Sequence, residues 1–187
     1  MQDFVHLHVH TQFSLLDGMS KIPRMVDKAI ADGMRGVAIT DHGNMFGVKE
    51  FFDYCQKVNK GRKKEGLEPF KPIFGCEMYV ARRGDKRLME GKVDSSGWHL
   101  VALAQHEVGY RNLIRLAARS WVDGYYMRPR TDHKDLAELH EGLIISTACI
   151  GGEVPKKILA GHTEEAEKTL LRFKELWRDD FYVELQR

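Results

Sequence analysis

Short apolar runs of strand type alternate with amphipathic helical segments along this chain, and this alternation constrains the fold more than any other feature. Strand-like runs occupy residues 4–10, 36–40, 72–80, 98–104, 142–148 and 181–185. Apolar residues recur at helical spacing in residues 20–33, 48–55, 112–120 and 163–177. Strands separated by helices predict an α/β fold with a parallel sheet. In parallel barrels, functional side chains gather where strands end and loops begin.

Capping residues and polar stretches predict where the elements end. Ser20 is predicted to cap the first helix, and Gly33 is placed to end it. Thr163 is predicted to cap the last helix, whose acidic first turn suits the helix dipole. Residues 60–68 and 82–96 are mostly polar and charged, which predicts loops. The basic residues of the first loop form either solvated surface or a DNA-facing patch.

Length and charge limit the class of protein. The chain of 187 residues can bury one core and needs no second domain, so we expect residues 1–187 to form a single domain. Its 29 basic and 27 acidic side chains nearly balance, so any contact with nucleic acid must be local. Three cysteines without CxxC spacing argue against a disulfide scaffold or a zinc knuckle. No run approaches the roughly 18 apolar residues of a membrane span. We therefore expect a soluble cytoplasmic protein that does not contact a membrane.

Two histidines of the first strand-like run are candidate metal ligands. His8 and His10 alternate with apolar residues, so both imidazoles are expected on one face, together with His6. Such a pair suits a divalent transition metal, although a hydrogen-bonded structural pair is the alternative. Asp17 adds an oxygen ligand in the following turn, unless it only forms that turn beside Gly18.

Further candidates stand in or near the later strand-like runs. Asp41 and His42 follow the second run, and Glu77 interrupts the third, where a buried carboxylate requires a cation or a strong donor. His99 and Cys149 extend the set, although Cys149 taken alone fits a small buried hydrophobic residue better than a ligand, and its inclusion rests on the other candidates. Together these positions predict a multinuclear metal site on a barrel rim. Such sites hydrolyse phosphoesters, because two or three ions neutralise phosphate oxygens and lower the pKa of a bound water.

Four segments carry a resemblance to a known family. They are HVHTQFSLLDG at residues 8–18, TDHGNMFG at 40–47, GYRNLIRL at 109–116 and GLIISTACIGGE at 142–153. The first two resemble motifs of the polymerase and histidinol phosphatase (PHP) superfamily. In order and spacing, all four resemble the amino-terminal PHP domains of bacterial DNA polymerase III alpha subunits, over essentially the whole chain.

The resemblance implies a fold and a ligand set. The fold is an α/β, distorted seven-stranded βα (TIM-like) barrel that holds up to three metals. The implied ligands of zinc, manganese or iron are His8, His10, Asp17, His42, Glu77, His99 and Cys149. No catalytic residue apart from these ligands, and no site for an organic cofactor, is implied. The family's last two ligands form an Asp-x-His motif on a later strand. We therefore expect residues 1–187 to be a PHP domain truncated at its carboxyl end, an incomplete barrel.

The resemblance also implies a function in DNA replication. The parent would be a DNA-directed DNA polymerase, a nucleotidyltransferase with magnesium at its polymerase site beyond Arg187, so this fragment would not extend primers. The PHP site would be either structural or a phosphoesterase, acting as a 3′ to 5′ exonuclease or a pyrophosphatase. Implied partners are DNA, other polymerase domains and replisome subunits, including a proofreading subunit. The alternative is a free-standing PHP phosphatase such as a histidinol phosphatase, against which the segments at 109–116 and 142–153 argue.

Overall fold

The computed structural model describes residues 4–15 and 17–186, so Leu16 of the first motif lies outside the described residues. The strands are β1 Gly36–Ile39, β2 Lys71–Ala81, β3 Gly97–Ala104, β4 Tyr125–Tyr126, β5 Arg128–Thr131, β6 Leu143–Ser146 and β7 Phe181–Tyr182. The helices are α1 Ile22–Ala31, α2 Val48–Lys64, α3 Gly91–Asp94, α4 Glu107–Val122, α5 His133–Glu138, α6 Glu153–Leu159 and α7 Thr163–Trp177, followed by the 3₁₀ turn η1 Arg178–Asp180. None of these described helices is long and apolar enough to cross a membrane.

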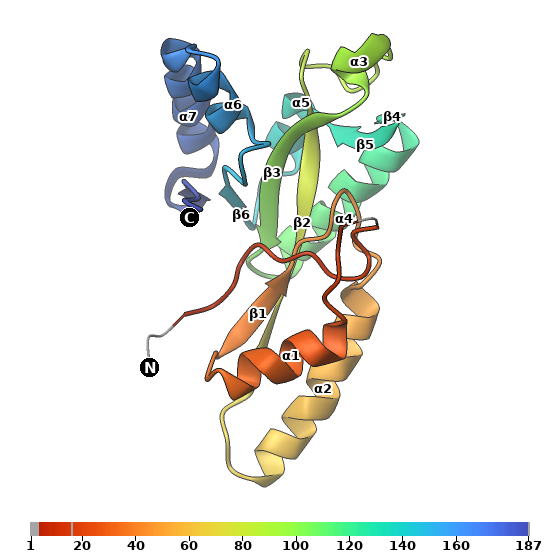
Figure 1. The fold of residues 1–187 in the computed structure, drawn as a ribbon, viewed down its shortest axis with the longest axis vertical. Helices are drawn as coiled ribbons and strands as arrows, with labels where there is room; N and C mark the ends of the chain where they lie inside the picture. The colour runs from red at the N-terminus through yellow and green to blue at the C-terminus, as the bar shows by residue number, and fades with distance from the viewer. Residues whose placement is uncertain (1–3, 16, 187) are drawn as a thin grey trace.

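The strands form one seven-stranded sheet around β2. Its order is β4-β5-β2-β3-β6-β7, and β1 pairs with the first half of β2 (Figure 1). β1 and β5 both run parallel to β2. β1 pairs with its first residues, where Gly36 lies opposite Lys71, and β5 pairs with its last residues, where Arg130 lies opposite Tyr79. This is a mixed α/β fold, as the resemblance to the PHP family implies.

The prediction of a parallel sheet is wrong for β3. This strand runs antiparallel to both of its neighbours, β2 and β6. The connection from β2 to β3 contains only the four-residue helix α3, which is too short to carry the chain back along the sheet as a parallel crossover requires. β3 therefore begins at the edge where β2 ends. In consequence His99, near the start of β3, lies opposite Tyr79, near the end of β2.

Residues 4–10 do not form the predicted strand. They run as extended chain beside β1, to which they are joined by bonds from Ala38 N to His6 O and from Thr40 N to Val9 O. The ladder stops there because Val9 N–H donates to the hydroxyl Oγ1 of Thr40, at 2.8 Å, and not to a backbone carbonyl. The histidines of this segment are therefore placed by a side chain as well as by the sheet.

The two predicted N-caps are also wrong. α1 begins at Ile22, and the side chain of Gln12 accepts a hydrogen bond from Ile22 N at 3.0 Å, so a distant residue supplies the cap expected from Ser20. In α7 the cap position is His162, and Thr163 is the first helical residue. Gly33 does follow the end of α1 with φ of +79°, the left-handed conformation that glycine adopts at little cost.

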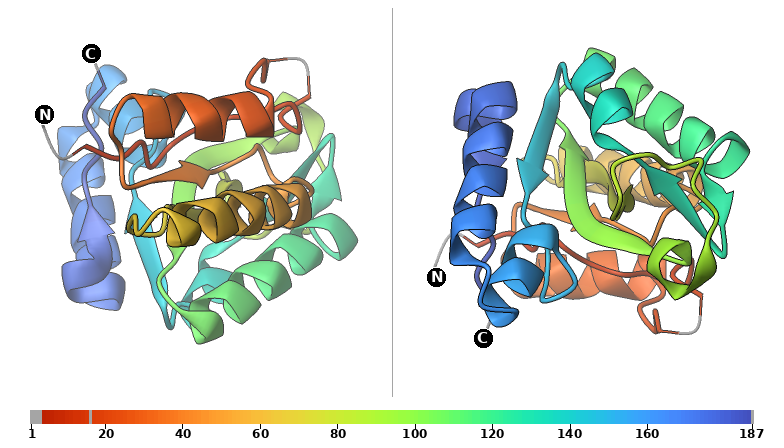
Figure 2. Two further views of the ribbon diagram at one scale, coloured as in Figure 1. Left: turned by 90° about the horizontal axis from the view of Figure 1, so that it is seen from below. Right: turned by 90° about the horizontal axis from the view of Figure 1, so that it is seen from above.

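The core lies on both sides of the sheet. One cluster, which includes Phe51 and Cys55, fills the space between α1, α2, β1 and the start of β2. A second, which includes Leu116 and Trp177, joins α4, α5 and α7 to β2, β3 and β6. In Figure 2, α7 forms one flank of the molecule beside β6 and α4 forms another. α2 continues to Lys64, so the first half of the predicted loop 60–68 is helical.

Candidate metal centre

Glu77 lies at the centre of a cluster of imidazoles. Its side chain is only 1 % exposed, so its charge must be met by protein groups or by a cation. Oε1 lies 3.1 Å from His8 Nε2 and 3.0 Å from His99 Nδ1. Oε2 lies 3.7 Å from His10 Nε2 and in direct contact with His42 Nδ1. Imidazoles from three segments of the chain therefore meet at one buried carboxylate.

The cluster contains two groups with the spacing of metal ligands. In each group the ligand atoms lie within 4.8 Å of one another, and the groups are His8, His10 and Glu77, and His42, Glu77 and His99. Glu77 belongs to both. Each of its oxygens contacts one histidine of each group, and a carboxylate shared in this way is suited to bridge two metal ions.

The other two candidates lie at the edge of the cluster. Cys149 Sγ, just after β6, is 3.4 Å from His99 Nδ1 and 3.6 Å from Glu77 Oε1. Asp17 Oδ2 is 2.8 Å from His42 Nε2. The structure thus brings all seven candidate ligands to one place.

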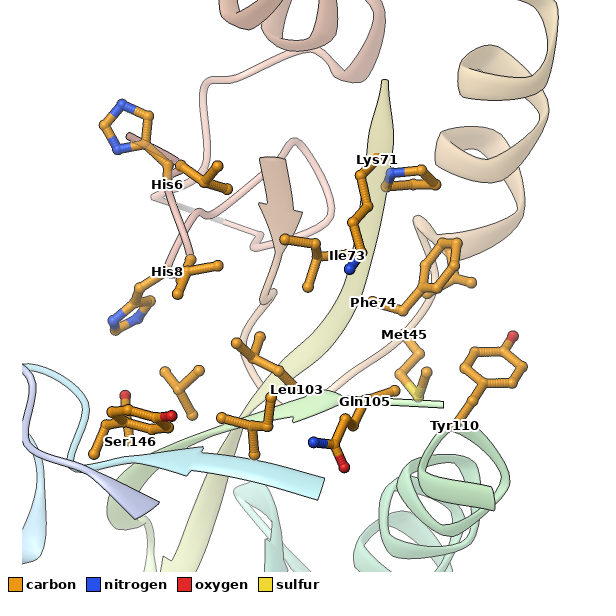
Figure 3. A pocket seen from close by; sticks show the side chains of 18 of the residues that line it. His6, His8, Met45, Lys71, Ile73, Phe74, Leu103, Gln105, Tyr110 and Ser146 are labelled. Carbon is orange, nitrogen blue, oxygen red and sulfur yellow. The ribbon is translucent and has the colours of Figure 1, made fainter. Parts of the chain in front are cut away.

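His6 is not part of the cluster. Its side chain is exposed, and its ring lies apart from that of His8 (Figure 3). The period-two argument placed all three histidines on one face of a strand, but residues 4–10 are not a strand, so the argument does not extend to His6.

Protons on the histidines balance the buried charge of Glu77. Burial alone would lower the pKa of His8, but hydrogen bonds with Glu184 and Glu77 outweigh it and raise that pKa to about 10. Burial also opposes protonation of His99, whose pKa is raised to about 9 by Cys149 and Glu77. The pKa of Glu77 is held far below its usual range because hydrogen bonds from His42, His8 and His99 exceed the cost of burial. A metal ion bound here would replace these protons.

The donor atoms fit a divalent transition metal. His42 Nδ1 and Glu77 Oε2 are buried and contact each other, and neither atom has a further hydrogen-bond partner among the described residues. These two polar atoms therefore have capacity to coordinate a metal ion. Imidazole nitrogen, carboxylate oxygen and thiolate sulfur together are the ligand types of zinc, manganese and iron.

Glu184 orients His8 and was missed by sequence analysis. Its Oε1 lies 2.7 Å from His8 Nδ1, and its Oε2 accepts a hydrogen bond from Ser146 Oγ at 2.6 Å. This contact turns the opposite nitrogen of His8 towards Glu77, as in the carboxylate–histidine–metal arrangement. The signal was present in the sequence, because Glu184 interrupts an apolar run just as Glu77 does.

Ser14 and Asp41 orient His10 in a similar way. Ser14 Oγ donates to Asp41 Oδ1 at 2.8 Å, so it can accept a hydrogen bond from His10 Nδ1, also 2.8 Å away. The remaining nitrogen of His10 then faces the cluster with a lone pair. Asp41 also binds the backbone N–H and the hydroxyl of Thr11, so its carboxylate holds the loop and does not enter the cluster.

A cavity adjoins the cluster on the side of His8. A mostly apolar space of about 1420 Å³ lies between the amino-terminal segment and strands β2, β3 and β6, with Ile73 and Leu103 on its wall (Figure 3). Of the seven candidate ligands only His8 lines it, and Glu184 and Ser146 lie beside His8 in the lining. The other candidate ligands therefore lie outside the lining of this cavity.

The basic residues 60–64 lie away from the rim. They form the end of α2, whose 17 residues extend about 25 Å from the loop that carries His42 (Figure 1). Their sequence position alone therefore does not connect them with the cluster.

Comparisons with known proteins identify relatives along the whole chain. The family model described as PHP domain matches residues 6–187. The DNA polymerase III subunit alpha of Borreliella burgdorferi is 44 % identical over 184 residues, which cover 98 % of this chain and 15 % of the relative. Those of Treponema pallidum and Thermus aquaticus are 39 % and 40 % identical, cover 98 % of this chain, and have 15 % and 14 % of their own length covered.

Among solved structures, a candidate metal-dependent phosphoesterase of Bifidobacterium adolescentis matches 64 % of this chain and 34 % of its own, at 22 % identity and a TM-score of 0.40. A likeness at this level carries no functional argument. The chain spans about 15 % of the length of the first curated relatives that it matches.

Proposed function

Because the chain belongs to the PHP domain family, we propose that its rim cluster binds divalent metal ions and hydrolyses phosphoesters, as a 3′ to 5′ exonuclease or a pyrophosphatase. The observation that carries the proposal is the buried carboxylate of Glu77, which contacts four imidazoles from three segments. A buried carboxylate requires a cation or strong donors, and imidazole nitrogens around a carboxylate form the ligand set of a divalent transition metal.

Seven residues are the proposed ligands: His8, His10, Asp17, His42, Glu77, His99 and Cys149. Bound zinc, manganese or iron would neutralise phosphate oxygens and lower the pKa of water. Neighbouring residues of the chain orient these ligands. Glu184 and Ser14 hold His8 and His10 with one ring nitrogen towards Glu77. Antiparallel pairing of β2 and β3 holds His99 against the same carboxylate.

We also propose a function for the protein to which this chain belongs. The chain matches the amino-terminal region of DNA polymerase III alpha subunits, which supports a role in DNA replication. We assign nucleotidyl transfer, with its magnesium site, to parts of such a polymerase outside these residues. Proposed partners are DNA, other polymerase domains and replisome subunits, including a proofreading subunit, and the proposed location is the cytoplasm.

Two alternatives use the same residues. A structural metal site would bind the ions without hydrolysis. A free-standing PHP phosphatase would act on a small phosphorylated metabolite, and the 44 % identity to a polymerase subunit over 98 % of the chain argues against it.

The test is metal-dependent hydrolysis of bis(p-nitrophenyl) phosphate. Protein treated with chelator and then supplied with manganese should hydrolyse this diester, and Glu77→Gln should reduce the rate to background. Glu164→Gln, at an exposed position in the first turn of α7, is the matched control and should keep the full rate. Stoichiometric metal without hydrolysis under any of the three metals would contradict the proposal and favour the structural role.

A further inference from the structure

Three exposed aromatic side chains form a row at the edge of the molecule. Phe46 comes from the loop between β1 and α2, Trp121 from the end of α4, and Tyr125 from β4. The ring centroids of Phe46 and Trp121 are 6.0 Å apart, and those of Trp121 and Tyr125 are 5.4 Å apart with an interplanar angle of 14°. These side chains are 62 %, 42 % and 49 % exposed, so much of their ring surface faces solvent. We call this set the aromatic row.

The aromatic row is continuous with the metal centre. Trp121 Nε1 donates a hydrogen bond to the carbonyl of Gly43 at 2.8 Å, and Gly43 directly follows the proposed ligand His42. Tyr79 stacks on the ring of the same ligand, His42, with centroids 5.8 Å apart. The guanidinium of Arg128 lies 5.9 Å from the centre of the Tyr79 ring. One loop and one stacked ring thus connect the row to the cluster.

Arg128 supplies an exposed positive charge at this position. It lies on β5 next to Met127, its side chain is exposed, and no ion pair joins it to a carboxylate among the described residues. The overall charge of +2 provides little general attraction for a polyanion, so a local cation beside the cluster matters more.

Stacked bases and phosphates are the chemistry that this surface fits. Aromatic side chains bind unpaired bases through their faces, independently of sequence, and a neighbouring cation meets the backbone. A pyrophosphate has no base and would leave the aromatic row unused. The paired bases of a duplex would offer it only their edges.

We propose that the aromatic row and Arg128 form the binding site for the unpaired end of a single-stranded polynucleotide, whose terminal phosphodiester lies at the metal cluster. This inference rests on the proposed hydrolytic function and names its substrate class. Phe46, Trp121 and Tyr125 stack the bases, and Arg128 contacts a phosphate. Trp121 also helps to hold the His42 loop.

The test measures affinity without hydrolysis. Fluorescence anisotropy of a labelled oligothymidylate in metal-free buffer gives the Kd of the full chain and its variants. Phe46→Ala and Tyr125→Ala should each weaken binding about tenfold, whereas Tyr125→Phe, which keeps the ring, should bind like the wild type. Arg128→Ala should weaken binding and lower the salt slope by about one. The matched control is Val122→Ala, which removes apolar surface at an 82 % exposed position beside Trp121 and should change nothing.

The outcomes separate this inference from the proposed function. Oligothymidylate that binds Phe46→Ala and Tyr125→Ala as tightly as Val122→Ala, or that does not bind the wild type, overturns the inference. Tighter binding of duplex than of single-stranded DNA also overturns it. Hydrolysis of bis(p-nitrophenyl) phosphate by the wild type, a substrate without bases, reports on the proposed function alone. If that hydrolysis persists while the ring variants bind normally, the metal centre stands and the aromatic row has another occupant, such as a protein partner.

Discussion

His8 lies between two carboxylates, with Nδ1 towards Glu184 and Nε2 towards Glu77. We expect Glu184→Ala to lower the affinity for manganese about 10- to 100-fold, because the ring of His8 loses the partner that fixes its orientation. Competition with a chromophoric chelator measures this affinity. Glu175→Ala, at an exposed position of α7, is the control. Unchanged affinity in Glu184→Ala would mean that His8 is held by other contacts.

At the scale of residues, the sequence identified which side chains could bind metal but not how each is oriented. Imidazoles and carboxylates beside apolar runs were visible as a pattern, and Glu77 stood out because a buried carboxylate is costly. The direction of Asp41 was not predictable, because it depends on hydrogen bonds to Thr11 and Ser14 that only the folded loop supplies. The contact of Glu184 with His8 was not predictable, because the sequence does not show that the segment after β7 lies beside His8.

A second buried carboxylate links three helices. Glu153 of α6 accepts hydrogen bonds from Lys157, from Thr169 of α7 and from Arg172, and lies 3.5 Å from His133 of α5. Burial would raise its pKa, but contacts with His133 and Lys157 dominate and lower it to about 2.

The depressed pKa of Glu153 predicts a pH dependence of stability. A carboxyl group whose pKa is lower in the folded state stabilises the fold above its unfolded value near 4.5 and loses this contribution as the pH falls towards 2. Glu153→Gln should therefore lower the urea midpoint at pH above 4.5, and the difference from the wild type should shrink towards pH 2. Glu164→Gln is the exposed control. A difference that persists at low pH would mean that packing, and not charge, is lost.

Substitution of two helical glycines by alanine is predicted to have opposite effects on stability. A Cβ at Gly109 of α4 would lie 1.7 Å from the carbonyl oxygen of Gly142, so Gly109→Ala forces α4 away from the loop before β6 and should cost about 1–3 kcal/mol or more. At Gly61 of α2 a Cβ meets nothing within 4 Å, so Gly61→Ala should stabilise by about 0.5–1 kcal/mol. Chemical denaturation measures both. Equal effects would contradict the close approach of α4 to Gly142.

At the scale of elements, long periodic segments were predictable and short ones were not. β2, β3, α4 and α7 have enough residues for a clear period. β4, β5, α5 and α6 have between two and seven residues, too few for a pattern, and were not predicted. The prediction of the α1 cap failed because Gln12, ten residues away in the sequence, accepts the hydrogen bond. A cap supplied by tertiary structure leaves no local signal.

At the scale of the whole molecule, the alternation of strands and helices predicted the α/β class but not the direction of β3. That direction brings the start of β3 and the end of β2 to one edge, so a single antiparallel pair places His99 beside Glu77. The family model and the polymerase relatives confirm the resemblance that the four sequence motifs carried. The metal ligands and the extent of the domain stay predictions.

Anomalous diffraction from crystals of this chain grown with manganese tests the central claim most directly, because it locates the ion and its ligands together. We predict anomalous peaks in the rim cluster, one bounded by His8, His10 and Glu77 and one bounded by His42, Glu77 and His99. Glu77 should contact both. Well-ordered crystals with no peak in the cluster, in which Glu77 still pairs with the four imidazoles, would contradict the account and make the cluster a buried ion-pair network.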